Sequence, residues 1–144
     1  MISTRFDSAK VLTVGDAMID RYWHGDAKRI SAEAPIPVVE VKEIEDRLGG
    51  AANVALNVST LGAESYLVAA TGSDVAAREL KDKLTASNIK STLLKDPLKP
   101  TTIKVRLVSQ NQQIVRADFE ENFDISPESL ISGATNFDRI DTLI

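Results

Sequence analysis

The stretch RLGGAANVALNVSTLGAESYLVAATG, which runs from Arg47 to Gly72, decides the predicted fold. After two adjacent glycines, apolar residues recur at the three-and-four spacing of one helix face. These residues are Ala51, Val54, Ala55, Val58 and Leu61. Gly62 is a typical helix stop, and residues 65–70 form an apolar run typical of a buried strand. The stretch therefore predicts a glycine turn, a helix and a strand in that order.

The segments on either side extend this alternation of strands and helices. Residues 11–14 are an apolar run that breaks at Gly15-Asp16, as a buried strand ending in a turn does. After the stretch, Ser73 or Asp74 is expected to cap a helix with Ala77, Leu80 and Leu84 on one face, and residues 89–95 favour a third strand. Such alternation predicts an α/β fold in which helices cover a parallel sheet.

Two further segments predict a second, smaller sheet. The run APIPVVEVK at residues 34–42 is extended, but its two prolines lack the N–H of a central strand, so we expect an edge strand or a projecting flap. In residues 103–119, Ile103, Val105 and Leu107 alternate with Lys104 and Arg106, which predicts an antiparallel hairpin with one solvated face.

The end of the chain predicts one more helix and one more strand. Ser126-Pro127 is a typical helix start, with a cap followed by proline at the first helical position. Residues 142–144 resemble a core strand that is interrupted, so we expect the chain to be a fragment.

Composition excludes several classes of function. Of the 144 residues, 43% are hydrophobic and 26% charged, which is the balance of a soluble globular protein. The 21 acidic and 17 basic residues are scattered, so nucleic acid is not an expected partner. The absence of cysteine excludes disulfides and thiolate sites, and the single His24 cannot build a metal cluster, so no metal ligands are predicted. No window approaches the roughly 20 apolar residues of a membrane helix. No membrane association is expected, and the cytoplasm is the expected location.

A ligand pocket is expected at the glycine turn. Ligands of open parallel sheets bind beyond the carboxyl ends of the strands, where Asp16, Asp20 and Gly49-Gly50 should lie. Adjacent glycines let a ligand approach the backbone, Asp20 can accept hydrogen bonds from two sugar hydroxyls, and Asn53 is well placed to face the pocket. The alternatives remain open: an ordinary tight turn for the glycines, turn capping for Asp16 or Asp20, and a solvated amide for Asn53.

Three basic residues are candidates to bind a substrate phosphate. Lys104 and Arg106 share the polar face of the predicted hairpin, and Arg116 of the returning strand can join them. Simple solvated charge on an exposed sheet is the alternative. The chain contains neither the G-x-G-x-x-G nor the G-x-x-x-x-G-K-[ST] nucleotide motif, which counts against a Rossmann-like dinucleotide-binding domain.

The glycine stretch resembles the first sequence pattern of the ribokinase (pfkB-type) family of carbohydrate kinases. GGAANVA at residues 49–55 is followed after six residues by Gly62 and after nine more by Gly72. Four segments are most similar to the family's heptose 7-phosphate kinases, which serve ADP-heptose synthesis for the lipopolysaccharide core. They are VGDAMIDRYWHGDAKRISAEAPIPVV from Val14, RLGGAANVALNVSTLGA from Arg47, PTTIKVRLVSQNQQIVRADFEE from Pro100 and DTLI from Asp141.

The resemblance implies the N-terminal half of a ribokinase-like fold. Residues 1–144 would be a partial kinase domain, with core segments 11–20, 48–100 and 120–144, and lid strands at about 21–47 and 101–119. The C-terminal ATP-binding half would be absent, as would the adenylyltransferase domain that follows this kinase in many bacterial proteins. By this resemblance the lid would be an antiparallel β-sheet that closes over the sugar and pairs two subunits, so a homodimer is expected.

By the same resemblance, Asp20, Gly49, Gly50 and Asn53 would bind the sugar. Met18 stands where ribokinase has a polar sugar contact, which favours a sugar other than ribose. The family's Gly-Ala-Gly-Asp stretch, with the catalytic aspartate, does not occur here. ATP and Mg²⁺ would serve the full-length enzyme, no catalytic residue is expected in this chain, and the chain alone is expected to be inactive and to bind no cofactor. Two alternatives remain: another ribokinase-like kinase for a hexose, a nucleoside or a pyrimidine precursor, and a non-catalytic sugar-binding or dimerisation module.

Overall fold

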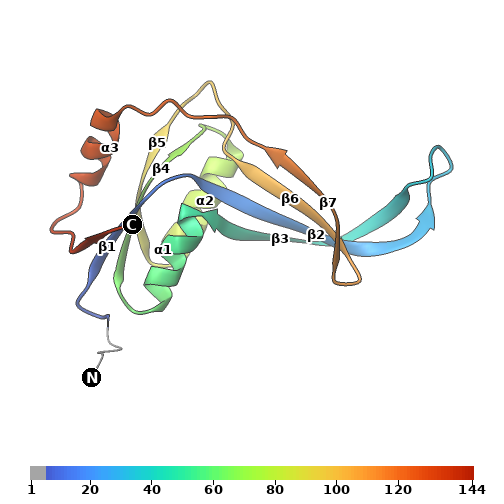
Figure 1. Ribbon diagram of the computed structural model, residues 1–144, viewed down its shortest axis with the longest axis horizontal. Helices are drawn as coiled ribbons and strands as arrows, with labels where there is room; N and C mark the ends of the chain where they lie inside the picture. The colour runs from blue at the N-terminus through green and yellow to red at the C-terminus, as the bar shows by residue number, and fades with distance from the viewer. Residues whose placement is uncertain (1–5) are drawn as a thin grey trace.

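A computed structural model describes residues 6–144, so the first five residues of the predicted domain lie outside the described range. The strands are β1 (Lys10–Val14), β2 (Ala17–Ile30), β3 (Pro37–Gly50), β4 (Glu64–Thr71), β5 (Ile89–Lys95), β6 (Ile103–Ser109), β7 (Gln112–Phe119) and β8 (Thr142–Leu143). The helices are α1 (Ala51–Thr60), α2 (Val75–Ala86) and α3 (Pro127–Ala134). They form a body and a second sheet that projects from it (Figure 1).

The body contains a parallel sheet in the order β5-β4-β1-β8. β4 lies second in this order and is almost entirely buried, which explains its near-continuous apolar sequence. The α/β fold with helices packed on a parallel sheet, predicted from the alternation around residues 47–72, is confirmed.

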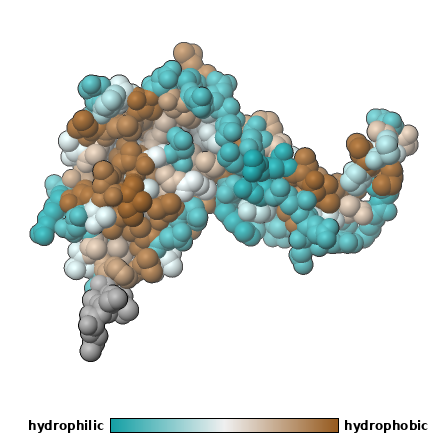
Figure 2. All heavy atoms as spheres, viewed as in Figure 1, coloured by the Kyte–Doolittle hydropathy of each residue, from teal (hydrophilic) through white to brown (hydrophobic). Residues whose placement is uncertain are grey.

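Alternate residues of β4 build two separate cores. Leu67 and Ala69 pack with apolar residues of α1 and α2, whereas Tyr66 and Val68 pack with residues of α3 and the segment after it. Because successive strand residues point to opposite faces, the helices cover both faces of the sheet. Figure 2 shows that hydrophobic side chains also gather at the surface beside the C-terminal residues, where Leu143 is 67% exposed.

The helices begin at the residues that capping chemistry favours. Of the two expected caps of α2, Asp74 is the one used, because its carboxylate accepts a hydrogen bond from the Ala77 N–H at 2.9 Å. α3 begins with Ser126 as cap and Pro127 at the first helical position, as predicted. α1 has no side-chain cap, and Gly50 occupies its N-cap position.

The second sheet, called the lid below, has the strand order β3-β2-β6-β7. The prediction that it is antiparallel is wrong, because β2 and β6 pair in parallel while β2–β3 and β6–β7 are antiparallel. The physical reason is the arrangement of two hairpins side by side. β2 and β6 both run away from the body and are neighbours, so the sheet is mixed.

The edge strand β3 and its neighbour β2 also differ in extent from the sequence prediction. β3 is the expected edge strand, but it begins at Pro37 and continues to Gly50, so the two glycines end a strand. Asp20 lies within β2 instead of in a turn after the first strand. Proline at the first position of β3 needs no ladder N–H, which is why the strand can begin there. Within residues 6–144, no helix is long and apolar enough to cross a membrane.

Candidate functional site

The junction between lid and body is built around Gly50. Its φ of +57° is a conformation that residues with a side chain rarely adopt, and a Cβ there would overlap the carbonyl oxygen of Asp16. That carbonyl accepts a hydrogen bond of 2.8 Å from the Ala51 N–H, which ties the start of α1 to the loop after β1. Glycine at this position therefore lets three chain segments meet at one point.

Gly49 brings the backbone against the carboxylate of Asp20. A Cβ at residue 49 would lie 2.9 Å from Asp20 Oδ2 and 2.7 Å from Met18 Cγ, closer than real Cβ contacts allow. Met18 is the register partner of Gly49 on the neighbouring strand. The structure thus places Asp20, Met18 and Gly49 together on one face of the lid, next to the start of α1.

Asp20 forms an ion pair with Arg106. The Arg106 guanidinium donates from Nη1 to Asp20 Oδ1 at 2.5 Å, and the two side chains are only 20% and 22% exposed. The two residues are 86 positions apart and meet because β2 and β6 are paired in parallel. The carboxylate predicted to bind sugar hydroxyls therefore has one oxygen engaged by a cation.

Asn53 lies in the first turn of α1 and is exposed. It lines the same cavity of about 510 Å³ as Asp20, Tyr22, Arg47 and Lys83. This volume lies in the range of small-molecule sites. Asp20, Gly49, Gly50 and Asn53, which sequence reasoning grouped as sugar contacts, are thus gathered at one junction.

The three basic residues predicted to bind phosphate share one face of the lid but differ in their partners. Arg116 lies opposite Arg106 in the β6–β7 register, and Lys104 lies opposite Asp118. The Lys104 ammonium is 2.8 Å from a carboxylate oxygen of Glu120 and 3.3 Å from one of Asp118, and the hydrogen bond with Glu120 raises the pKa of Lys104. Arg116 Nε lies 2.9 Å from Asp118. Local carboxylates therefore already neutralise Lys104 and Arg116.

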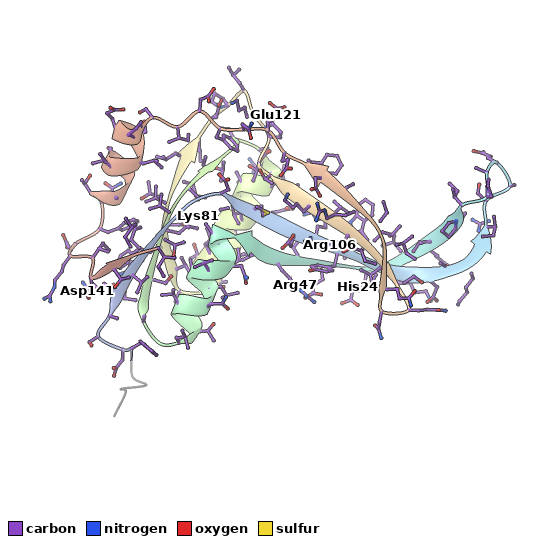
Figure 3. All side chains as sticks on the ribbon, in the orientation of Figure 1. His24, Arg47, Lys81, Arg106, Glu121 and Asp141 are labelled. Carbon is purple, nitrogen blue, oxygen red and sulfur yellow. The ribbon has the colours of Figure 1, made fainter. Side chains whose placement is uncertain are left out.

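Sequence reasoning missed two residues on this face, Tyr22 and Arg47. The Arg47 guanidinium carbon lies 4.4 Å from the centre of the Tyr22 ring, and that of Arg106 lies 5.5 Å from the same ring. Figure 3 shows Arg47 and His24 extending from the same side of the lid. Arg47 could have been found from its position two residues before Gly49, because alternate residues of a strand point to the same face.

This arrangement can bind a polyhydroxylated ligand. The Asp20 carboxylate accepts hydrogen bonds, the Asn53 amide both donates and accepts, and the glycines allow close backbone approach. Among residues 6–144, no group of three or more His, Cys, Asp or Glu side chains is placed to hold a metal ion.

Known proteins show the same combination of sequence and fold. Residues 8–142 match the family described as pfkB family carbohydrate kinase. The chain is 53% identical over 128 residues to the bifunctional protein HldE of Stutzerimonas stutzeri (strain A1501), an alignment that covers 89% of this chain and 27% of that protein. It is 52% identical over 136 residues to the bifunctional protein HldE of Pseudomonas putida (strain GB-1), covering 94% and 28% respectively. The chain thus spans little more than a quarter of these curated relatives.

Solved structures of sugar kinases share the fold. The microbiome-derived acarbose kinase Mak1 matches with a TM-score of 0.68 and 25% identity, over 89% of this chain and 43% of that one. A carbohydrate kinase from Agrobacterium tumefaciens matches with a TM-score of 0.61 and 20% identity, over 76% of this chain and 35% of that one, and shows the fold alone. The ribokinase-like fold and the family resemblance of the glycine stretch are both confirmed. Because the family match covers nearly all of the described residues, the chain belongs to the pfkB family of carbohydrate kinases.

Proposed function

We propose that this chain is the acceptor-sugar-binding part of an ATP-dependent kinase. The substrate would be D-glycero-D-manno-heptose 7-phosphate, phosphorylated at its anomeric hydroxyl in the synthesis of ADP-heptose for the lipopolysaccharide core. The observation that carries the proposal is the 52–53% identity to HldE proteins over 128 and 136 residues, which include the lid and the glycine junction. The cluster of Asp20, Gly49 and Asn53 supports the binding of a sugar there.

In this proposal the chain contributes position and specificity. Asp20 Oδ1 is held by Arg106, which fixes the carboxylate against Gly49 and leaves Oδ2 to accept hydrogen bonds from sugar hydroxyls. Asn53 lines the same cavity and can bind a further hydroxyl. Holding the acceptor in one orientation converts an encounter between two molecules into a step within one complex, and the lid excludes water from it.

ATP and Mg²⁺ would be the cofactors of the whole enzyme. A metal ion would screen the charge of the transferred phosphate. Among residues 6–144, no three His, Cys, Asp or Glu side chains are grouped to hold an ion, and we assign no step of the reaction through it to this chain. We expect residues 1–144 alone to have no kinase activity.

The lid is also the proposed dimer surface, with a second copy of this chain as its partner. The face opposite Asp20 carries Trp23, Ile44, Val115 and Phe119, which are 36–60% exposed. An apolar sheet face of this kind is typical of an interface. Light scattering should show a dimer for the wild type and a monomer for Ile44→Asp, and a monomeric wild type would contradict this proposal.

The cytoplasm remains the proposed location.

The test of the proposed function is an assay of the whole protein that carries this chain. We expect ATP-dependent ADP release with heptose 7-phosphate and much less with hexoses or nucleosides. Asp20→Asn should lower kcat/KM about tenfold to a hundredfold, because a charge-assisted hydrogen-bond acceptor is lost. The matched control is Asp26→Asn, farther along the same strand, which should retain wild-type kinetics. A preference for another sugar or a nucleoside would refute the heptose substrate, and the absence of any kinase activity would favour a binding or dimerisation module.

A further inference from the structure

The cavity beside Asp20 is lined by four charged side chains, those of Asp20, Asp46, Arg47 and Lys83. Two carboxylates line it, those of Asp20 and Asp46, and each is neutralised by an arginine that is not part of the lining. Arg106 pairs with Asp20, and Arg21 holds Asp46 through two hydrogen bonds of 2.7 Å while also pairing with Glu79 at 2.8 Å. Of the two lining cations, Arg47 pairs with Glu45, which is not part of the lining, so Lys83 is the one lining charge without an ion pair among residues 6–144.

Lys83 reaches the cavity from α2, whereas Arg47 lies on the edge strand β3. Within residues 6–144, Lys83 forms no ion pair or side-chain hydrogen bond. Two cations from separate elements therefore border one cavity that also contains Asp20 and Asn53.

Arg47 has a more exposed ion pair than Lys104. It makes a bidentate pair with Glu45, two residues earlier on the same strand, and the two side chains are 54% and 41% exposed. The pair is open to solvent, so an incoming dianion can reach the guanidinium and replace Glu45 through the same two N–H groups. By contrast Lys104 is 19% exposed and lies between two carboxylates, so the same exchange there would be costly.

Tyr22 holds the Arg47 guanidinium in place. The ring lies 4.4 Å from the guanidinium carbon, a cation–π distance, and Tyr22 lines the same cavity. A planar guanidinium ordered on an aromatic face loses little freedom when it binds a phosphate through two N–H groups. Arg47 is also the register partner of Asp20, so a sugar held by Asp20 lies beside it.

We propose that Arg47, with Lys83 in the lining of the same cavity, binds the phosphate group already present on the acceptor sugar and so selects sugar phosphates over free sugars. This inference rests on the proposed function, and it assigns the phosphate to Arg47 and Lys83 in place of Lys104 and Arg116. In the absence of the phosphate, Glu45 forms the ion pair with the Arg47 guanidinium, and the phosphate replaces it there.

The test compares two ligands that differ only in the phosphate. Isothermal titration calorimetry on the whole protein would measure the Kd of D-glycero-D-manno-heptose 7-phosphate and of unphosphorylated D-glycero-D-manno-heptose. For Arg47→Gln we expect binding of the phosphorylated sugar to weaken at least about tenfold, with less than about a twofold change for the free sugar. Arg47→Lys should fall between wild type and Arg47→Gln, because it keeps the charge but not the bidentate geometry.

Arg29→Gln is the matched control, since Arg29 lies on the distal part of β2 and is exposed. Wild-type preference for the phosphorylated sugar that survives unchanged in Arg47→Gln would overturn the assignment to Arg47 and leave the proposed function intact. Equal weakening for both sugars would also overturn it, because it would show a structural role. A wild type without any preference for the phosphorylated sugar would refute the proposed substrate as well.

Discussion

Substituting Gly50 by alanine tests whether the junction between lid and body requires glycine. The residue has φ +57° and ψ −134°, and an added Cβ would overlap the Asp16 carbonyl oxygen. A side-chain-bearing residue in such a region costs about 1–3 kcal/mol. Moving the Asp16 carbonyl would also break its 2.8 Å hydrogen bond with the Ala51 N–H, worth about 0.5–1.5 kcal/mol. We expect Gly50→Ala to lower the free energy of unfolding by about 3 kcal/mol.

Gly62→Ala is the matched control. Gly62 also has a positive φ, of +91°, but an added Cβ would meet no heavy atom within 4 Å. Its cost should therefore be the backbone term alone, about 1 kcal/mol. Urea denaturation followed by far-UV circular dichroism at 25 °C gives both free energies from the midpoint and the slope. Equal losses in the two variants, or a loss below about 1 kcal/mol for Gly50→Ala, would refute the steric argument.

Two further predictions concern the body. Asp74→Ala should lower the free energy of unfolding by about 2–3 kcal/mol in urea titrations. The substitution removes the α2 cap at Ala77 and the carboxylate that accepts two hydrogen bonds from buried Thr101. A loss below about 0.5 kcal/mol would contradict this role. Glu64→Gln should destabilise the protein at neutral pH but not near pH 2. Hydrogen bonding, chiefly from Lys90, lowers the pKa of Glu64 from 4.5 to about 2, so its contribution is present above pH 4.5 and is lost as the pH falls through 2. Urea midpoints of both proteins across this range test it, and a constant difference would contradict the pH dependence.

Much of the body followed from local sequence patterns. The helix after Gly49-Gly50, the strand at residues 65–70 and the cap of α2 depend on contacts within a few residues, so periodicity and turn chemistry predict them. Local patterns predicted the lid less well, because β2 carries apolar, aromatic and charged residues on both faces and shows no clean alternation. Its parallel pairing with β6 joins segments more than 80 residues apart, which no local pattern encodes.

The sequence by itself determined the family and the glycine junction, because residue types at fixed spacings are local properties. Only the tertiary structure decided which charges neutralise which. Arg106 pairs with Asp20, Lys104 and Arg116 share nearby carboxylates, and Arg47 lies over Tyr22 at the edge of the cavity. Ion pairs between strands depend on register and on neighbours distant in the chain, so the electrostatics of the site emerged only when the lid sheet was assembled.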